Sequence, residues 1–193
     1  NTLTVRDNMA LRDRVLPELV EYAGERGVRL IVENCVMEGW HPDGYPGNLA
    51  YSPELWHWVT GLGFGLNWDP SHFVWQGLDP VGFLWDFRDR IYHVDCKDAK
   101  KQVGNGRNGR MGSHLPWADP RRGWDFVSTG HGDVPWEACF RMLNTIGYDG
   151  PISVEWEDAG MDRLVGAPEA LAFVRNLAFD PPTAAFDAAF SRS

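Results

Sequence analysis

The sequence is poor in cysteine and has no long hydrophobic run. Its three cysteines (Cys35, Cys96 and Cys139) are widely spaced and form no CxxC pair, which argues against a disulfide framework and against a thiolate zinc site. We therefore expect a reducing, cytoplasmic setting. No run approaches the roughly 18 apolar residues of a membrane span, and no signal-peptide pattern opens the chain, so we expect no membrane partner.

The charge balance and one missing motif exclude further classes of protein. Acidic residues number 27 against 18 lysines and arginines, which gives a formal net charge of −9. Nucleic-acid binding needs a basic footprint, so a small polar substrate suits this chain better. A doubly wound nucleotide-binding sheet usually carries a glycine-rich phosphate loop after its first strand. The glycines at 104–109 lack the flanking strand and helix.

What the sequence does contain is an alternation of short apolar runs with helical patterns. Strands are predicted at 29–33, 64–68, 91–96, 151–156 and, more weakly, 124–128. Helices are predicted over 8–26, from Ser52, from Asp79, from Asp133 to Gly147, and over about 162–177. This alternation is typical of parallel β/α units, whose strand carboxyl ends open onto one face.

The number of units is too small for a closed barrel, which typically needs about 250 residues. We therefore predict an α/β chain of the (β/α)8 TIM-barrel type that is incomplete. One domain is expected over residues 1–180, with a flexible C-terminal tail at 181–193. The first residue is Asn and not Met, which also indicates a fragment or a processed chain.

Four of the apolar runs end in a carboxylate: Glu33, Asp69, Asp95 and Glu155. If these side chains converge at the barrel mouth, they would repel one another unless a cation lay among them. An all-oxygen set favours Mn²⁺ or Mg²⁺, and adding His72 or His93 would widen the choice to Co²⁺ or Zn²⁺. The alternative for each acid is a helix cap or a solvated loop position.

Other residues near the strand ends are candidates for binding a substrate. His72 follows Asp69 by three residues and can reach the same site. Lys97 and Asp98 could steer substrate oxygens or could pair with each other at a strand end. Tryptophans beside the acids, Trp40 and Trp68, would provide aromatic walls for the apolar faces of a sugar.

Five segments together resemble the sugar phosphate isomerase/epimerase family of xylose-isomerase-like (AP endonuclease 2-like) barrels. They are Ile31-Val32-Glu33-Asn34-Cys35, residues 65–72 with Asp69-Pro70-Ser71-His72, residues 90–98 with Lys97-Asp98, residues 130–136, and residues 147–158 with Glu155. The resemblance extends from about residue 8 to 177. It implies a TIM-like barrel portion that comprises strands four to eight with their helices.

The resemblance also implies a site. In such proteins a divalent ion is held by residues matching Glu33, Asp69 and Glu155 and by a histidine in the sixth strand. Relatives typically have His-Val-His-Ala-Lys-Asp there, and this chain has Asp95 in place of the second histidine, so His93 is the fallback ligand. Glu33 and Glu155 would act as the acid/base pair beside the substrate carbonyl, through an enediolate, and His72 would bind a substrate oxygen.

Several functions fit this scaffold. The first is a divalent-metal-dependent isomerase or epimerase of a sugar or sugar phosphate. The second is a dehydratase of inositol-type substrates, which would share the metal and the enolate but lose water. An endonuclease relative is disfavoured by the acidic charge. The fourth is a non-catalytic product, either a carbohydrate-binding relative or a truncated chain whose exposed sheet edges would promote homo-oligomers.

Overall fold

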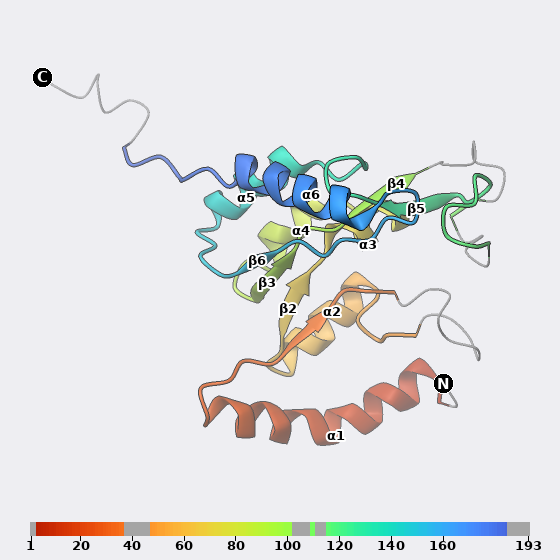
Figure 1. The fold of residues 1–193 in the computed structure, drawn as a ribbon. Helices are drawn as coiled ribbons and strands as arrows, with labels where there is room; N and C mark the ends of the chain where they lie inside the picture. Colours follow the sequence, from red (N-terminus) through yellow and green to blue (C-terminus); the bar gives the residue numbers. More distant parts are fainter. Residues whose placement is uncertain (1–2, 37–46, 102–108, 111–114, 185–193) are drawn as a thin grey trace, which may run out of the picture.

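The computed structural model describes residues 3–36, 47–101, 109–110 and 115–184. Its central feature is a four-stranded parallel sheet in the order β1-β2-β3-β6 (Figure 1). The strands are β1 (Ile31–Glu33), β2 (Gly65–Trp68), β3 (Ile91–Asp95) and β6 (Ile152–Ser153). Because parallel strands run in one direction, the carboxyl ends of all four lie along one edge of the sheet.

Helices separate these strands, as the alternating pattern predicts. They are α1 (Val5–Gly24), α2 (Pro53–Gly61), α3 (Pro70–Gln76), α4 (Pro80–Asp86), α5 (Trp136–Thr145) and α6 (Arg163–Leu177). Two of them start in the same way, because Asp69 and Asp79 each cap a helix whose first residue is proline. The sequence analysis found the second of these starts and missed α3.

The main core lies between the sheet and α2 to α6. Trp56, Leu84 and Val94 are fully buried in it, and Trp56 makes edge-to-face contacts with Phe73 and Phe83. Aromatic side chains of this size each bury a large apolar area, so this cluster is the main source of stability for the sheet and its helices.

The predicted strand at 124–128 exists but lies elsewhere. β5 (Trp124–Val127) pairs antiparallel with β4 (Asp98–Lys101) in a separate two-stranded sheet, so it is not a fifth parallel strand. β4 follows β3 almost directly and carries the chain past the end of the parallel sheet (Figure 1). The expectation that residues 124–128 form a parallel strand of the barrel is therefore wrong.

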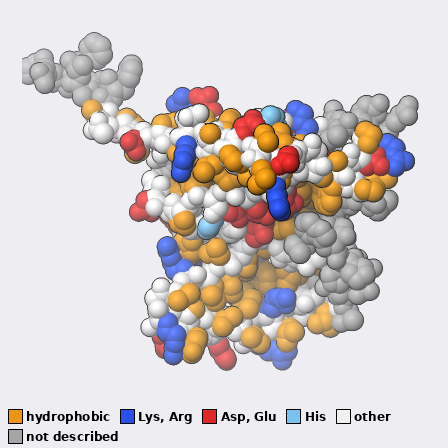
Figure 2. All heavy atoms as spheres, in the orientation of Figure 1, with side chains coloured by type: hydrophobic (Ala, Val, Ile, Leu, Met, Phe, Trp, Pro, Cys, Tyr) orange, Lys and Arg blue, Asp and Glu red, His pale blue; other side chains and the backbone are white. Residues whose placement is uncertain are grey.

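Helix α1 buries only part of its apolar surface. Leu16 and Val20 lie against the core, whereas the stripe formed by Leu11, Val15 and Leu19 is 41 to 54% exposed. Pro17 lies inside the helix, which continues on both sides of it. Figure 2 shows hydrophobic side chains gathered over the lower part of the molecule, where α1 and β1 lie. No described helix is both long and apolar enough to cross a membrane.

Candidate active site

Three of the four predicted acids meet at the carboxyl ends of the strands. Glu33, Asp69 and Glu155 each place a carboxylate oxygen within 4.8 Å of the other two. Glu33 ends β1, Asp69 directly follows β2, and Glu155 lies two residues beyond β6. Figure 2 shows acidic side chains gathered in the middle of the visible face. Residues more than 120 positions apart in the sequence are thus brought together by the parallel topology.

Asp69 is oriented by its role as a helix cap. Its Oδ1 accepts hydrogen bonds from the Ser71 backbone N–H at 2.8 Å and from the Ser71 hydroxyl at 2.6 Å. Its Oδ2 has no hydrogen-bond partner among the described residues and is turned toward the cluster. Burial raises the pKa of this fully buried carboxyl well above its usual range, and Lys97 opposes the shift.

Asn34 fixes the two strand ends relative to each other, and the sequence analysis missed it. Its side chain donates to the Asp69 carbonyl at 2.7 Å and accepts from the Asp69 backbone N–H at 2.7 Å. The side chain of Asn34 is 1% exposed, so neither bond competes with water. This reciprocal pair sets the separation between Glu33, on one strand end, and Asp69, on the next.

Lys97 places its ammonium group among the acids. Its Nζ lies 2.7 Å from Glu155, 3.1 Å from Glu157 and 3.7 Å from Asp69. Burial opposes the charge on Lys97, but these carboxylates together hold its pKa above the ordinary value. Lys97 therefore stays protonated and neutralises part of the negative charge.

One ammonium does not balance the carboxylates gathered here. Burial, followed by repulsion from Glu155, raises the pKa of Glu33 from 4.5 to about 7. The buried Glu33 Oε1 has no hydrogen-bond partner within the described residues, and neither does Asp69 Oδ2. The cluster therefore has unpaired carboxylate oxygens from several strands and more negative charge than Lys97 neutralises. Such a site fits a hard divalent cation such as Mn²⁺ or Mg²⁺.

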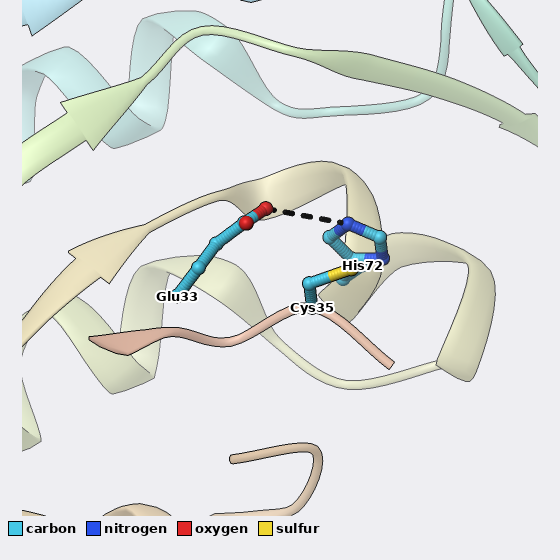
Figure 3. Close-up of side chains that lie close together, drawn as sticks. All are labelled: Glu33, Cys35 and His72. Carbon is cyan, nitrogen blue, oxygen red and sulfur yellow. Dashed lines mark ion pairs between the residues drawn. The ribbon is translucent and has the colours of Figure 1, made fainter. Parts of the chain in front are cut away.

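A second group of potential ligands shares Glu33 with the first. Glu33, Cys35 and His72 also place one ligand atom each within 4.8 Å of one another. Figure 3 shows the Glu33 carboxylate facing the His72 ring, at 3.7 Å from Nε2, with the Cys35 sulfur beside that ring. Burial, with a smaller contribution from Lys97, lowers the pKa of His72 well below its usual value, so the ring is neutral. Sulfur and nitrogen donors of this kind would suit Zn²⁺ or Co²⁺.

Asp95 and His93 form a separate pair. Asp95 accepts from Asn67 at 2.6 Å, and its other oxygen lies 3.3 Å from His93 Nε2. His93 Nε2 also lies 2.7 Å from the Ser153 hydroxyl. Neither residue belongs to the two candidate groups above. Asp95 adds to the repulsion that raises the pKa of Glu33, so it contributes negative charge to the site.

This arrangement of acids on parallel strand ends coincides with a family match. A model of the family described as xylose isomerase-like TIM barrel matches residues 8–177. The chain belongs to this family. The family resemblance and the TIM-barrel fold class that the sequence indicated are therefore confirmed, and the described parallel strands form an open part of such a barrel.

Known proteins are similar to part of this xylose isomerase-like chain. The Bacillus subtilis protein YfiH, described as uncharacterized, is 32% identical over 130 residues, which cover 64% of this chain and 42% of YfiH. An inosose dehydratase of Lacticaseibacillus casei is 29% identical over 92 residues, which cover 48% of this chain and 30% of the dehydratase. These neighbours include named enzymes, although the chain spans less than half of each.

Among solved structures, 3-keto-D-glucoside 4-epimerase YcjR of E. coli, in its apo form, has a TM-score of 0.64 at 15% identity. The similarity covers 91% of this chain and 56% of YcjR. At this identity the similarity shows the fold alone.

Two other residues predicted to bind a substrate of this xylose isomerase-like chain make structural contacts instead, and a third lies outside the described residues. Asp98 accepts hydrogen bonds from the Trp136 indole and from three backbone N–H groups between Gly130 and Val134, so its carboxylate holds that loop. Trp68 is 1% exposed in the core and presents no face to a ligand. Trp40 lies outside the described residues.

Aromatic residues that the sequence analysis did not select line the other side of His72. The Phe126 ring makes an edge contact with His72 at 5.6 Å and lies 4.5 Å from Lys97 Nζ. Trp75 and Trp124 stack in parallel beside Phe126, with their ring centroids 4.6 Å apart. Strand β5, with Trp124 and Phe126, and helix α3, with Trp75, thus supply an apolar wall that limits water around the buried polar groups.

Proposed function

We propose that this chain contributes the catalytic residues of a divalent-metal-dependent sugar isomerase or epimerase. The observation that supports the proposal most is the placement of the half-buried Glu33 and Glu155 in one all-oxygen cluster around the buried Asp69, with a Glu33 pKa of about 7. A carboxyl group with such a pKa can both give and accept a proton near neutral pH.

Each residue of the cluster would have its own role in the proton transfer. Glu33 and Glu155 approach the substrate from different strands and exchange a proton with the carbon beside its carbonyl group. Lys97 donates to Glu155 at 2.7 Å, and this contact orients the carboxylate that would act as the base. Glu33, Asp69 and Glu155 would hold a divalent ion, whose positive charge would polarise the carbonyl oxygen and so favour the enediolate form of the substrate. Mn²⁺ and Mg²⁺ are the first choices, with Zn²⁺ and Co²⁺ as alternatives.

Proton exchange with solvent tests this proposal. The protein is incubated with Mn²⁺ and a panel of ketoses in D2O, and deuterium at the carbon beside the carbonyl is followed by NMR. We expect exchange with at least one ketose, slowed by at least about 100-fold in Glu155→Gln. Glu169→Gln is the control, because Glu169 pairs with His131 on the surface. Unchanged exchange in Glu155→Gln would remove Glu155 from the mechanism.

A dehydratase of inositol-type ketones is the second candidate, supported by the sequence similarity to inosose dehydratases. Proton removal would be the same, but the intermediate would then expel a hydroxide ion. Mass spectrometry of the reaction with an inosose separates the two functions, since dehydration gives a product lighter by one water. A chain that binds no metal and exchanges no proton would instead be a non-catalytic relative.

A further inference from the structure

Trp75 makes a hydrogen bond to His72 that has no part in the mechanism proposed above. The two residues lie one helical turn apart on α3, and the Trp75 indole Nε1–H donates to His72 Nδ1 at 3.3 Å. An indole nitrogen can only donate a hydrogen bond. His72 Nδ1 must therefore accept, which means that it carries no proton. Because every neutral imidazole has one N–H, the proton of His72 lies on Nε2.

The indole that sets this arrangement is itself held in place. Trp75 is 1% exposed, and its ring stacks on Trp124 with an angle of 3° between the ring planes. Rotation of the indole away from His72 would break this stack inside a closely packed cluster. The hydrogen bond is thus supported by packing on the face of the ring as well as by its own geometry.

The protonated nitrogen points into the acid cluster. His72 Nε2 lies 3.3 Å from Asp69 Oδ2 and 3.7 Å from Glu33 Oε1. In the described part of the chain none of these three atoms has a hydrogen-bond partner, and the His72 side chain is 3% exposed. An N–H donor in a dry site thus faces oxygens that have free lone pairs.

We propose that Trp75 is a positioning residue that fixes His72 in the Nε2–H tautomer. His72 then presents a donor to the acid cluster and, once a sugar is bound, to an oxygen of that sugar. It cannot ligate a metal, because Nδ1 accepts the indole N–H and Nε2 bears the proton. The ion is thereby directed to the oxygen group of Glu33, Asp69 and Glu155 and away from the group that contains Cys35. The part about the sugar rests on the proposed function, whereas the tautomer does not.

Long-range ¹H–¹⁵N NMR of the imidazole rings tests the tautomer directly. The His72 signals are assigned by their loss in His72→Gln. In the wild type we expect Nδ1 to show the shift of an unprotonated ring nitrogen and Nε2 that of a protonated one. Trp75→Phe keeps an aromatic ring for stacking but removes the donor, so the ring should change to the Nδ1–H form or to a mixture of both forms.

Trp124→Phe is the matched control. It alters the same aromatic stack, but no described residue accepts a hydrogen bond from the Trp124 indole, so the tautomer should stay as in the wild type. A protonated Nδ1 in the wild type would overturn the proposal, and so would an unchanged His72 spectrum in Trp75→Phe. If Trp75→Phe does not fold, the wild-type spectrum alone decides.

Turnover gives an independent measurement. If the proposed function holds, Trp75→Phe should raise KM by roughly five- to tenfold and change kcat less, because a donor to the bound sugar is lost. A wild type that turns over no sugar would contradict the proposed function but leave the tautomer result valid. Normal turnover with an unchanged KM in Trp75→Phe would overturn the role of this tautomer in substrate binding.

Discussion

At the scale of single residues, Glu33 couples the site to pH. It belongs to both candidate ligand groups, and its pKa is raised to about 7 by burial and by the neighbouring acids. A carboxyl group whose pKa is higher in the folded protein than in the unfolded chain favours folding when it is protonated. That contribution is fully present below about pH 4.5 and is lost as the pH rises through about 7.

We therefore predict that Glu33→Gln stabilises the metal-free protein at pH 8 and has little effect at pH 4.5. The Glu33 side chain is 32% exposed, so solvent screening reduces the gain at pH 8 to about 1–2 kcal/mol. Thermal unfolding of the wild type and the variant at both pH values measures this difference. The pKa of Asp69 is raised in part by Glu33, so the substitution also relieves some of that shift, and this adds to the gain at pH 8. An equal effect of the substitution at the two pH values would contradict the assignment.

At the scale of elements, the side chain of Asn34 holds the carboxyl ends of β1 and β2 together. Its two hydrogen bonds to the Asp69 backbone are buried, and removing the amide leaves both backbone groups without a partner. We predict that Asn34→Ala lowers the free energy of unfolding by about 2–3 kcal/mol, as measured by urea denaturation. Asn144→Ala is the control, since the partly exposed Asn144 side chain donates one hydrogen bond, to the Phe179 carbonyl. Equal losses in the two variants would show that Asn34 does not join the strands.

The parallel units could be predicted from local sequence, because each has a visible start or end. The Asp79-Pro80 pair indicates a helix start, and the acids after apolar runs mark the ends of strands. The direction of β5 could not be predicted in this way. A four-residue strand has the same local pattern whether it joins a parallel sheet or pairs antiparallel with β4.

In the site, too, local sequence indicated single residues but not their contacts with distant segments. Glu33, Asp69 and Glu155 could be selected because each stands at the end of an apolar run, a position that is visible in the sequence. Asn34 and Trp75 could not be selected, because their roles depend on which atoms of other segments they face. Lys97 was selected as a substrate ligand, yet in the structure it contacts three carboxylates, which requires knowledge of the tertiary arrangement.

At the scale of the whole molecule, the described chain leaves apolar surface uncovered. The α1 stripe of Leu11, Val15 and Leu19 is exposed, and β1 and β6 each pair with a single strand of the described sheet. Ile31 and Ile152, on these edge strands, are more than a third exposed. Open edges and contiguous apolar surface favour association with other chains.

We predict that the 193-residue chain self-associates at tens of micromolar and that the α1 stripe contributes to this. Sedimentation velocity should show species larger than a monomer, and Val15→Lys with Leu19→Lys should shift the distribution toward the monomer. The control is Glu18→Lys with Glu21→Lys, which changes charge on the same helix without removing apolar surface. A monomeric wild type would contradict the prediction.

The central claim is that Glu33, Asp69 and Glu155 share one divalent ion. The chain offers a matched pair of variants, since Asp69 and Asp79 both cap a helix that starts with proline, yet only Asp69 belongs to the cluster. Asparagine is also a good cap, so Asp69→Asn and Asp79→Asn should both keep their helices.

Mn²⁺ binding followed by EPR is the most direct measurement. The account predicts one Mn²⁺ per wild-type chain, the same affinity in Asp79→Asn, and an affinity at least about tenfold weaker in Asp69→Asn. A wild type that binds no ion, or an Asp69→Asn variant that binds Mn²⁺ as tightly as the wild type, would contradict it.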